Sequence, residues 1–248
     1  ARAADQWDAL LGRVQVEGAS EDQRTTLYSN LYRLYLYPNS GSENAGSNDA
    51  PDWRYASQNS GSSDNAQGND HRSFAPVRDG KVLVNNGFWD TFRTVWPAYG
   101  LLTPDRAGSL IDGFLEQYRA GGWVARWSSP GYADLMVGTS SDVAFADAWA
   151  KGIGGFDTTL AYQAALKNAT VMPPDRHVGR KGMAHATFDG YMSTGIDGGM
   201  SWTMESALND FGIAQMARGL STSARDPSLQ RRYADEAAYF GYRAAGYA

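Results

Sequence analysis

TPDRAGSLIDGFLEQYRAGG, residues 103–122, is the stretch that most clearly predicts which kind of fold this sequence adopts. Thr103 stands before Pro104, and proline is favoured at the first position of a helix because its missing N–H would be unpaired there anyway. Two glycines then end the pattern. Between these signals, large apolar side chains recur at the spacing of one helix face, at Leu110, Ile111, Phe114, Leu115 and Tyr118. The stretch therefore predicts a long helix with one buried face.

Helical patterns continue on both sides of this stretch. Residues 20–37 open with Ser20-Glu21-Asp22-Gln23, the pattern of a capping box, in which the side chains of the first and last of these residues satisfy free backbone N–H groups. Strand signals are confined to short pieces such as residues 81–84, KVLV. The sequence thus predicts an all-α protein, with further helices at about 1–16, 140–151, 158–170, 202–219 and 227–244.

The order of these helices narrows the architecture. Helices joined by short turns form antiparallel hairpins, and many hairpins in succession build either a solenoid or a closed double ring. No repeat of fixed period is present, which favours the ring. Residues 38–73 break the pattern, because they are rich in Ser, Asn, Gly and Asp. We interpret them as a long mobile loop, part of a polar insertion that covers about residues 38–80.

Composition excludes several classes of function. The chain has 248 residues, no cysteine, and 22 Lys and Arg against 27 Asp and Glu, for a net charge of -5. This balance argues against a nucleic-acid partner, since phosphate binding needs clustered basic residues. The lack of cysteine excludes disulfides, Cys-ligated metals and thiol catalysis. No apolar run approaches the roughly 20 residues of a membrane helix, so we expect no membrane span. The first residue is Ala1 rather than Met, which indicates processing or part of a longer protein.

Common catalytic motifs are missing as well. The sequence contains neither a Gly-x-Ser-x-Gly elbow nor a phosphate-binding Gly-x4-Gly-Lys-Ser/Thr loop. Its three histidines, His71, His177 and His185, do not form a His-Glu-x-x-His motif, and we expect all three to be ordinary surface or core residues. We therefore predict no metal site built wholly from this chain.

Two clusters place aromatic residues beside charged ones. The first is FWDTFR, residues 88–93, with Trp89, Asp90 and Arg93; the second is GGWVARW, residues 121–127, which ends at Trp127. An aromatic ring can cover the apolar C–H face of a sugar, while Asp and Arg bind its hydroxyls. The same residues also suit a core tryptophan and a surface ion pair, because aromatic residues at helical spacing usually pack inside.

A third segment, GGMSWTMESALNDF, covers residues 198–211. Its two glycines lead into a helix with Ser201 near the cap, which places Glu205 at about the end of the first turn. Glu205, Asn209 and Gly212 then share a stripe of small and polar residues that can face a cavity. Alternatively Glu205 is structural, because the helix dipole favours acidic residues in the first turn.

Taken in order, these segments resemble the catalytic domain of glycoside hydrolase family 92, the calcium-dependent exo-acting α-mannosidases. Seven motifs carry the resemblance through nearly the whole chain: LYSNLYR with YPN (27–39), FWDTFRTVWP (88–97), GGWVARW (121–127), MVG (136–138), ADAWAKG (146–152), AY with KNA (161–169) and MESALNDF (204–211).

The resemblance implies a double ring of six helical hairpins, an (α/α)6 toroid, of which residues 1–248 would be the N-terminal half. Complete members place a β-sandwich before the ring and act by inversion. Glu205 matches the family's general acid, while Trp89, Asp90 and Arg93 fall in the motif that lines the terminal mannose subsite. Trp127 lies in a stretch near that pocket.

Other parts of the family's machinery are missing from this sequence. Inversion needs two carboxyl groups, one to protonate the leaving oxygen and one to activate water. The family's base lies in a Gly-Asn-Asp-Asp-type motif that does not occur before Ala248. We therefore expect a fragment that lacks the sandwich, the second half of the ring, the catalytic base and most calcium ligands, and that exposes apolar faces of its helices.

These observations lead to one main expectation and two alternatives. The main expectation is an inverting exo-α-mannosidase that removes terminal α-linked mannose from glycans, secreted or periplasmic, and inactive as this isolated fragment. Calcium would be its cofactor. The first alternative is a non-catalytic carbohydrate-binding or interaction module. The second is a helical-ring hydrolase that acts on glucosides, which the Trp-Asp-Thr-Phe-Arg string argues against.

Overall fold

Helices form the body of the molecule, as the spacing of apolar residues predicts. The computed structural model describes residues 2–59 and 75–247. In it residues 104–121 form α5 (Pro104–Gly121). The helix ends at Gly122, which adopts the left-handed conformation with φ 78°. The predicted capping box is confirmed at the start of α2 (Glu21–Leu34), where Ser20 Oγ accepts from the Gln23 N–H and Gln23 Oε1 accepts from the Ser20 N–H.

Most helix boundaries lie within about four residues of the predicted ones, but the first helix ends at Leu11 rather than at residue 16. The helices at the predicted positions are α1 (Arg2–Leu11), α6 (Ser141–Ala150), α7 (Thr158–Thr170), α9 (Gly199–Ser223) and α10 (Pro227–Ala244). The sequence did not predict three shorter helices, α3 (Phe88–Thr91), α4 (Val95–Leu102) and α8 (Met183–Asp189). The protein is therefore mostly helical.

Short strands correct the all-α prediction. Among the described residues, three small antiparallel sheets form, of which two join only two strands each. Their strands are β1 (Asn39–Ser40) with β5 (Leu83–Val84), β2 (Glu43–Asn44) with β3 (Trp53–Ala56) and β4 (Val77–Asp79), and β6 (Asn86–Gly87) with β7 (Trp127–Ser128).

The polar insertion is only partly the loop that its composition indicates. Its described part carries β1 to β4, and Tyr55 of β3 is buried, with its hydroxyl donating to Glu116 Oε1 of α5 at 2.9 Å. The described part of the insertion therefore contains short strands, of which β3 is anchored to α5. The rest of the 38–73 segment, His71 included, lies outside the described residues.

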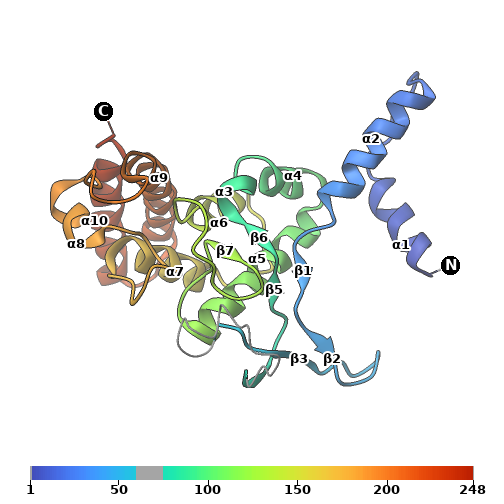
Figure 1. Ribbon diagram of the computed structural model, residues 1–248, viewed down its shortest axis with the longest axis horizontal. Helices are drawn as coiled ribbons and strands as arrows, with labels where there is room; N and C mark the ends of the chain where they lie inside the picture. Colours follow the sequence, from blue (N-terminus) through green and yellow to red (C-terminus); the bar gives the residue numbers. More distant parts are fainter. Residues whose placement is uncertain (1, 60–74, 248) are drawn as a thin grey trace.

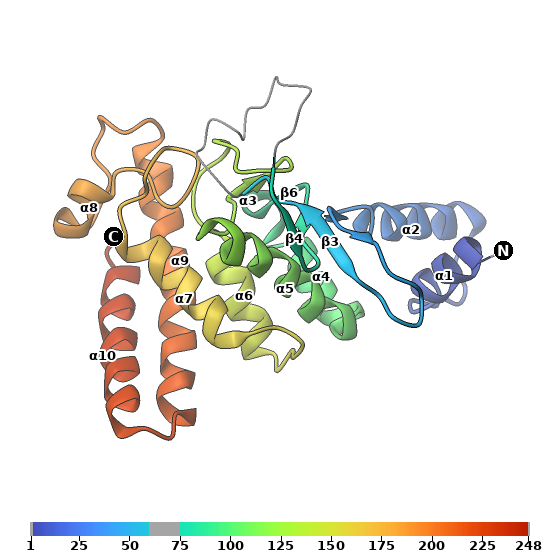
Figure 2. The ribbon, with the colours of Figure 1, turned by 90° about the horizontal axis from the view of Figure 1, so that it is seen from below.

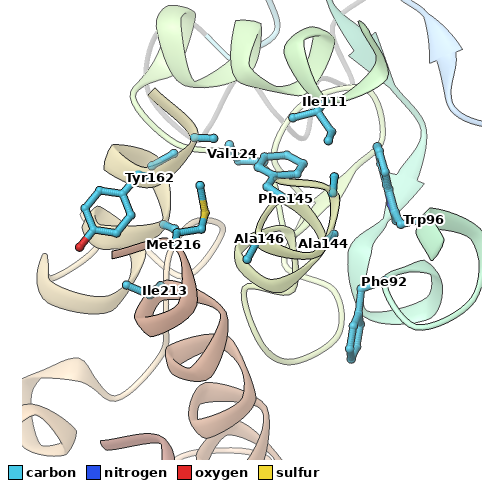
Figure 3. Close-up of a cluster of buried hydrophobic side chains, with 14 of the residues drawn as sticks. Phe92, Trp96, Ile111, Val124, Ala144, Phe145, Ala146, Tyr162, Ile213 and Met216 are labelled. Atoms are coloured by element: carbon cyan, nitrogen blue, oxygen red, sulfur yellow. The ribbon is translucent and has the colours of Figure 1, made fainter. Parts of the chain in front are cut away.

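One hydrophobic core joins α4, α5, α6, α7, α9 and α10. Figure 3 shows its centre, where Ile111 of α5, Phe145 of α6 and Met216 of α9 meet. Phe88, at the start of α3, is fully buried in the same core, with its ring 5.0 Å from that of Phe114 and 5.4 Å from that of Trp96. This contact anchors α3 and so fixes the residues that follow Phe88.

The two ends of the chain lie at opposite ends of the molecule (Figure 1). Figure 1 shows α1 and α2 at one end and α9 and α10 at the other, and Figure 2 shows α9 and α10 side by side as an antiparallel hairpin. One apolar stripe of α9 is exposed and consists of Met200, Met204, Leu208 and Phe211. None of the helices in the described part of the chain combines the length and the apolar character that crossing a membrane requires.

Candidate active site

The short helix α3 carries two of the predicted site residues on a fixed base. The Phe88 N–H donates to the backbone oxygen of Arg126 at 3.2 Å, which ties α3 to the strand segment before Trp127. Because the Phe88 ring is buried, the next two side chains turn outward: Trp89 is half-buried and Asp90 is exposed. The predicted cluster at 88–93 is therefore core at Phe88 and available for chemistry at Trp89 and Asp90.

Glu205 joins this cluster from the far end of the chain. Its Oε1 accepts from Trp89 Nε1 at 3.1 Å and from the Arg93 guanidinium at 3.0 Å. The Glu205 side chain is 15% exposed, whereas that of Arg93 is 56% exposed. Three of the predicted residues thus meet around one carboxylate oxygen, with the acid recessed and the arginine at the surface.

The position of Glu205 in α9 differs from the sequence prediction. Gly198, with φ 70°, is the N-cap, so Glu205 lies about two turns into the helix rather than at the end of the first. The favourable dipole of the first turn therefore does not explain this acid. Asn209 and Gly212 on the same face of α9 are buried, and Gly212 lies against Val143 of α6 rather than against a cavity.

A glycine from another segment lies against Glu205. Gly138 has φ +75°, and a Cβ placed on it would come within 2.9 Å of the Glu205 Cβ and 3.3 Å of Asn209 Nδ2. Only glycine combines that backbone conformation with so close an approach. The MVG motif at 136–138 therefore forms one wall beside the acid.

Asp90 and Trp127 lie together around a cavity of about 500 Å³. The Trp127 ring packs over Gly87, where a Cβ would meet a ring carbon at 2.1 Å, so β6 and β7 set its position. Asn86 borders the same cavity, and its buried Nδ2 has no hydrogen-bond partner among the described residues. A buried donor beside an aromatic ring and a carboxylate suits a hydroxylated ligand.

The predicted residues thus form two neighbouring groups. Hydrogen bonds among the described residues join Glu205 to Trp89 and Arg93, and not to Asp90 or Trp127. The groups are linked through α3, since Trp89 and Asp90 are adjacent. Sequence reasoning missed Asn86. It lies two residues before the FWDTFR cluster, but it belongs to no motif or periodic pattern.

Sequence reasoning also missed a buried ionic network behind Glu205. Arg180 is fully buried and donates to Asp210 at 2.7 Å and to Asp142 at 3.4 Å. Thr139 and Asn168 also donate to Asp142, at 2.6 and 2.8 Å. Burial nevertheless raises the pKa of Asp142 from 3.8 to about 6, because desolvation outweighs these donors. No sequence pattern links these residues.

The described residues do not make a calcium site. Among them, no group of three or more His, Cys, Asp or Glu is placed to hold a metal ion. The two buried carboxylates, Asp142 and Asp210, face arginines instead. Of the two described histidines, His177 contacts Asp175 at 3.1 Å and His185 is exposed.

Known structures share this fold. An inverting mannosidase of family GH92 from Bacteroides thetaiotaomicron aligns over 99% of this chain with a TM-score of 0.82 and 30% identity, and the chain covers 30% of that structure. A second GH92 α-mannosidase of the same organism aligns over 99% with a TM-score of 0.72; its 18% identity shows the fold alone, and 29% of its length is covered.

A curated relative and a family pattern agree with these structures. An uncharacterised secreted glycosidase of Arthroderma benhamiae is 37% identical over 166 residues, which is 56% of this chain and 22% of the relative. The chain thus spans less than a third of each of these relatives. The pattern of the glycosyl hydrolase family 92 catalytic domain matches residues 1–248, and the chain belongs to that family.

Proposed function

We propose that the protein containing this chain is an inverting exo-α-mannosidase and that Glu205 is its general acid. The observation that carries the proposal is the recessed Glu205 carboxyl held by Trp89 and Arg93. The family membership and the mannosidases among the similar structures support the substrate class. Glu205 lies beside residues that suit a sugar, which a purely structural acid would not need.

The geometry gives each oxygen of Glu205 a separate task. Oε1 accepts both hydrogen bonds, and Oε2 is left to carry a proton. As the glycosidic C–O bond breaks, this proton passes to the leaving oxygen and Glu205 becomes a carboxylate. Trp89 and Arg93 then stabilise the new negative charge where it forms, in a site that needs no rearrangement. Water attacks the opposite face of the sugar and loses its proton to a base that we assign to no residue of this chain.

The cavity beside Asp90 supports binding of a terminal sugar. Trp127 offers an aromatic surface, Asp90 accepts from hydroxyls, and Asn86 Nδ2 donates to one. The cavity is linked to Glu205 through α3, because Asp90 directly follows Trp89, whose Nε1 donates to Glu205. In this proposal the mannose ring lies against Asp90 and Trp127, with its glycosidic oxygen toward Glu205.

The wider setting of the chain is part of the same proposal. Residues 1–248 would form the N-terminal half of an (α/α)6 toroid, completed by the second half of the ring and a β-sandwich. Calcium would be held mostly by residues outside this chain. A secreted relative supports a secreted or periplasmic location.

Substitution Glu205→Gln in the full-length natural protein tests the acid. We expect kcat to fall about 100-fold or more on mannosides with a poor alcohol leaving group, because general acid catalysis contributes about that much. A 2,4-dinitrophenyl leaving group departs without a proton, so kcat on that mannoside should stay within about threefold of the wild type.

Glu236→Gln provides the control for that experiment. The Glu236 side chain is also largely buried, at 20% exposed. It accepts hydrogen bonds from Tyr162 of α7 and Arg232 of α10, and it does not line the sugar cavity. Glu236→Gln should lower kcat on the alcohol and the 2,4-dinitrophenyl mannosides equally, or leave both values unchanged. Near wild-type rates of Glu205→Gln on both substrates would overturn the acid assignment. Binding of mannosides without hydrolysis by the wild type would favour the non-catalytic alternative.

A further inference from the structure

Two buried oxygens on one face of α9 have no partner among the described residues. They are Oε2 of Glu205 and Oδ1 of Asn209. A buried polar atom without a partner is costly, so native structures rarely leave one without a functional reason. Two such atoms on adjacent turns of one helix call for a shared explanation.

The two side chains are neighbours by helix geometry. Residues four apart on a helix have Cβ atoms about 5–6 Å apart, within reach of each other's polar ends. Both side chains also border the same residue, since a Cβ on Gly138 would contact the Glu205 Cβ and Asn209 Nδ2. The Gly138 backbone therefore closes the space that the two side chains share.

The orientation of the Asn209 amide is held from behind. Its Nδ2 faces Thr139 Oγ1 at 3.5 Å, and that hydroxyl donates to Asp142 at 2.6 Å while it accepts from Arg180 at 3.2 Å. Asn209 is completely buried. With the nitrogen directed to the ionic network, the amide carries an acceptor oxygen on its other side.

We propose that Asn209 is a positioning residue whose Oδ1 accepts a hydrogen bond from the protonated Oε2 of Glu205. An amide oxygen can only accept, so it faces an ionised Oε2 with no donor between them, whereas one proton on Oε2 satisfies both atoms. Asn209 thus fixes where the proton of the acid sits. When a glycoside binds, its glycosidic oxygen replaces Asn209 as the acceptor. This inference rests on the proposed function of Glu205.

The test compares Asn209→Leu with Asn168→Leu in the full-length protein. Asn168 is a matched control, because it is also buried, also has an unpartnered Oδ1, and donates to Asp142 in the same network from α7. Asn209→Leu should lower kcat about tenfold or more on mannosides with alcohol leaving groups, the size of one lost hydrogen bond to an acid. On 2,4-dinitrophenyl mannoside, kcat of Asn209→Leu should stay within about twofold of the wild type, because that leaving group needs no proton.

Further variants make the outcome decisive. Asn209→Gln keeps an uncharged amide on the same face of α9 and should retain more kcat on alcohol leaving groups than Asn209→Leu. Asn209→Ala removes the oxygen without added volume and replaces Asn209→Leu if that variant does not fold. Two other unpartnered hydroxyls are alternative donors to Asn209: Ser140 Oγ, which borders Gly138, and Ser206 Oγ, three residues before Asn209 on α9. A loss with Ser140→Ala or Ser206→Ala equal to that of Asn209→Leu would overturn the proposal.

The remaining outcomes separate this inference from the proposed function. Asn209 would have only a structural role if Asn209→Leu lowered kcat equally on both substrates. The same would follow if Asn168→Leu showed the same dependence of kcat on the leaving group. If Glu205→Gln shows leaving-group dependence and Asn209→Leu does not, only the inference fails. If Glu205→Gln itself shows none, the acid assignment fails and the inference fails with it.

Discussion

Arg93 contacts the proposed general acid directly in the structure. The motif places it in a sugar-binding cluster, but its guanidinium pairs with Glu205 at 3.0 Å. In the proposed mechanism, an arginine there stabilises the carboxylate that forms when Glu205 gives up its proton. We therefore predict that Arg93→Met lowers kcat/KM on mannosides with alcohol leaving groups about tenfold, the low end for a charge-assisted hydrogen bond at a half-exposed residue. Steady-state kinetics of the full-length protein measure this.

Arg232→Met is the control for this prediction. Arg232 has nearly the same side-chain exposure, 54% against 56%, and pairs with one carboxylate, Glu236, at 2.8 Å. It lies on α10 and should leave kcat/KM unchanged. If both substitutions reduce activity alike, the Arg93 effect reflects general surface charge and not the acid.

The sequence predicted the members of the site better than their contacts. Glu205 lies 112 residues from Arg93 and 116 from Trp89, and no periodicity connects such distant positions. Only the ordered motifs of the family resemblance placed them together. Asn86 and Asn209 drew no attention as functional residues, because an asparagine becomes informative only when burial leaves one of its polar atoms without a partner.

Gly138 shows how one element limits another. Its segment passes so close to α9 that a Cβ would come within 2.9 Å of the Glu205 Cβ, and its φ of +75° already disfavours a side chain. We predict that Gly138→Ala displaces the acid and lowers kcat on alcohol leaving groups about 100-fold, because small displacements of a catalytic group cost about that much. Kinetics on that substrate and on 2,4-dinitrophenyl mannoside measure the effect.

Gly152→Ala separates displacement from backbone strain. Gly152 has φ +73°, almost the same conformation, but a Cβ there meets nothing within 4 Å. The strain of a left-handed alanine, roughly 1 kcal/mol, is therefore common to both variants. Loss of activity in Gly152→Ala as large as in Gly138→Ala would mean that strain, not contact with Glu205, causes the effect.

At the scale of elements, strong capping signals predicted helices to within a few residues, and weak patterns failed for physical reasons. α4 carries Pro97 near its start, where proline is tolerated but resembles a helix break from sequence alone. α8 buries only Met183, so it has no apolar stripe. The strands of the insertion have polar compositions, and their order comes from the Tyr55 contact with α5 rather than from local preference.

At the scale of the whole molecule, one ionic network connects the helices behind the site. Arg180 bridges Asp142 of α6 and Asp210 of α9, and Arg243 of α10 pairs with Asp210 at 2.9 Å. Buried ion pairs stabilise a fold less than their number suggests, because each charge loses its hydration. They do restrict how the helices can pack, so this network fixes α9, and with it Glu205, relative to the rest of the chain.

The raised pKa of Asp142 gives this network a distinct pH dependence. Burial raises that pKa from 3.8 in the unfolded chain to about 6, so the folded state binds more protons between these values. The contribution of Asp142 to the free energy of unfolding is therefore complete below pH 3.8 and is lost as the pH rises through about 6. We predict that wild type gains stability relative to Asp142→Asn as the pH falls from 7 to 4, by at most about 1.4 kcal/mol per pH unit. Urea unfolding of the full-length protein at several pH values measures it.

Asp226→Asn is the control with the opposite sign. The Asp226 side chain accepts from Ser228 at the start of α10, which lowers the pKa of Asp226 below 3.8. Its contribution is present at neutral pH and disappears as the carboxylate is protonated, so wild type should lose stability relative to Asp226→Asn as the pH falls. For each variant, the difference in free energy of unfolding from the wild type is plotted against pH. If the two plots slope in the same direction, burial does not raise the pKa of Asp142. The donors from Thr139, Asn168 and Arg180 then keep that carboxylate charged inside the protein.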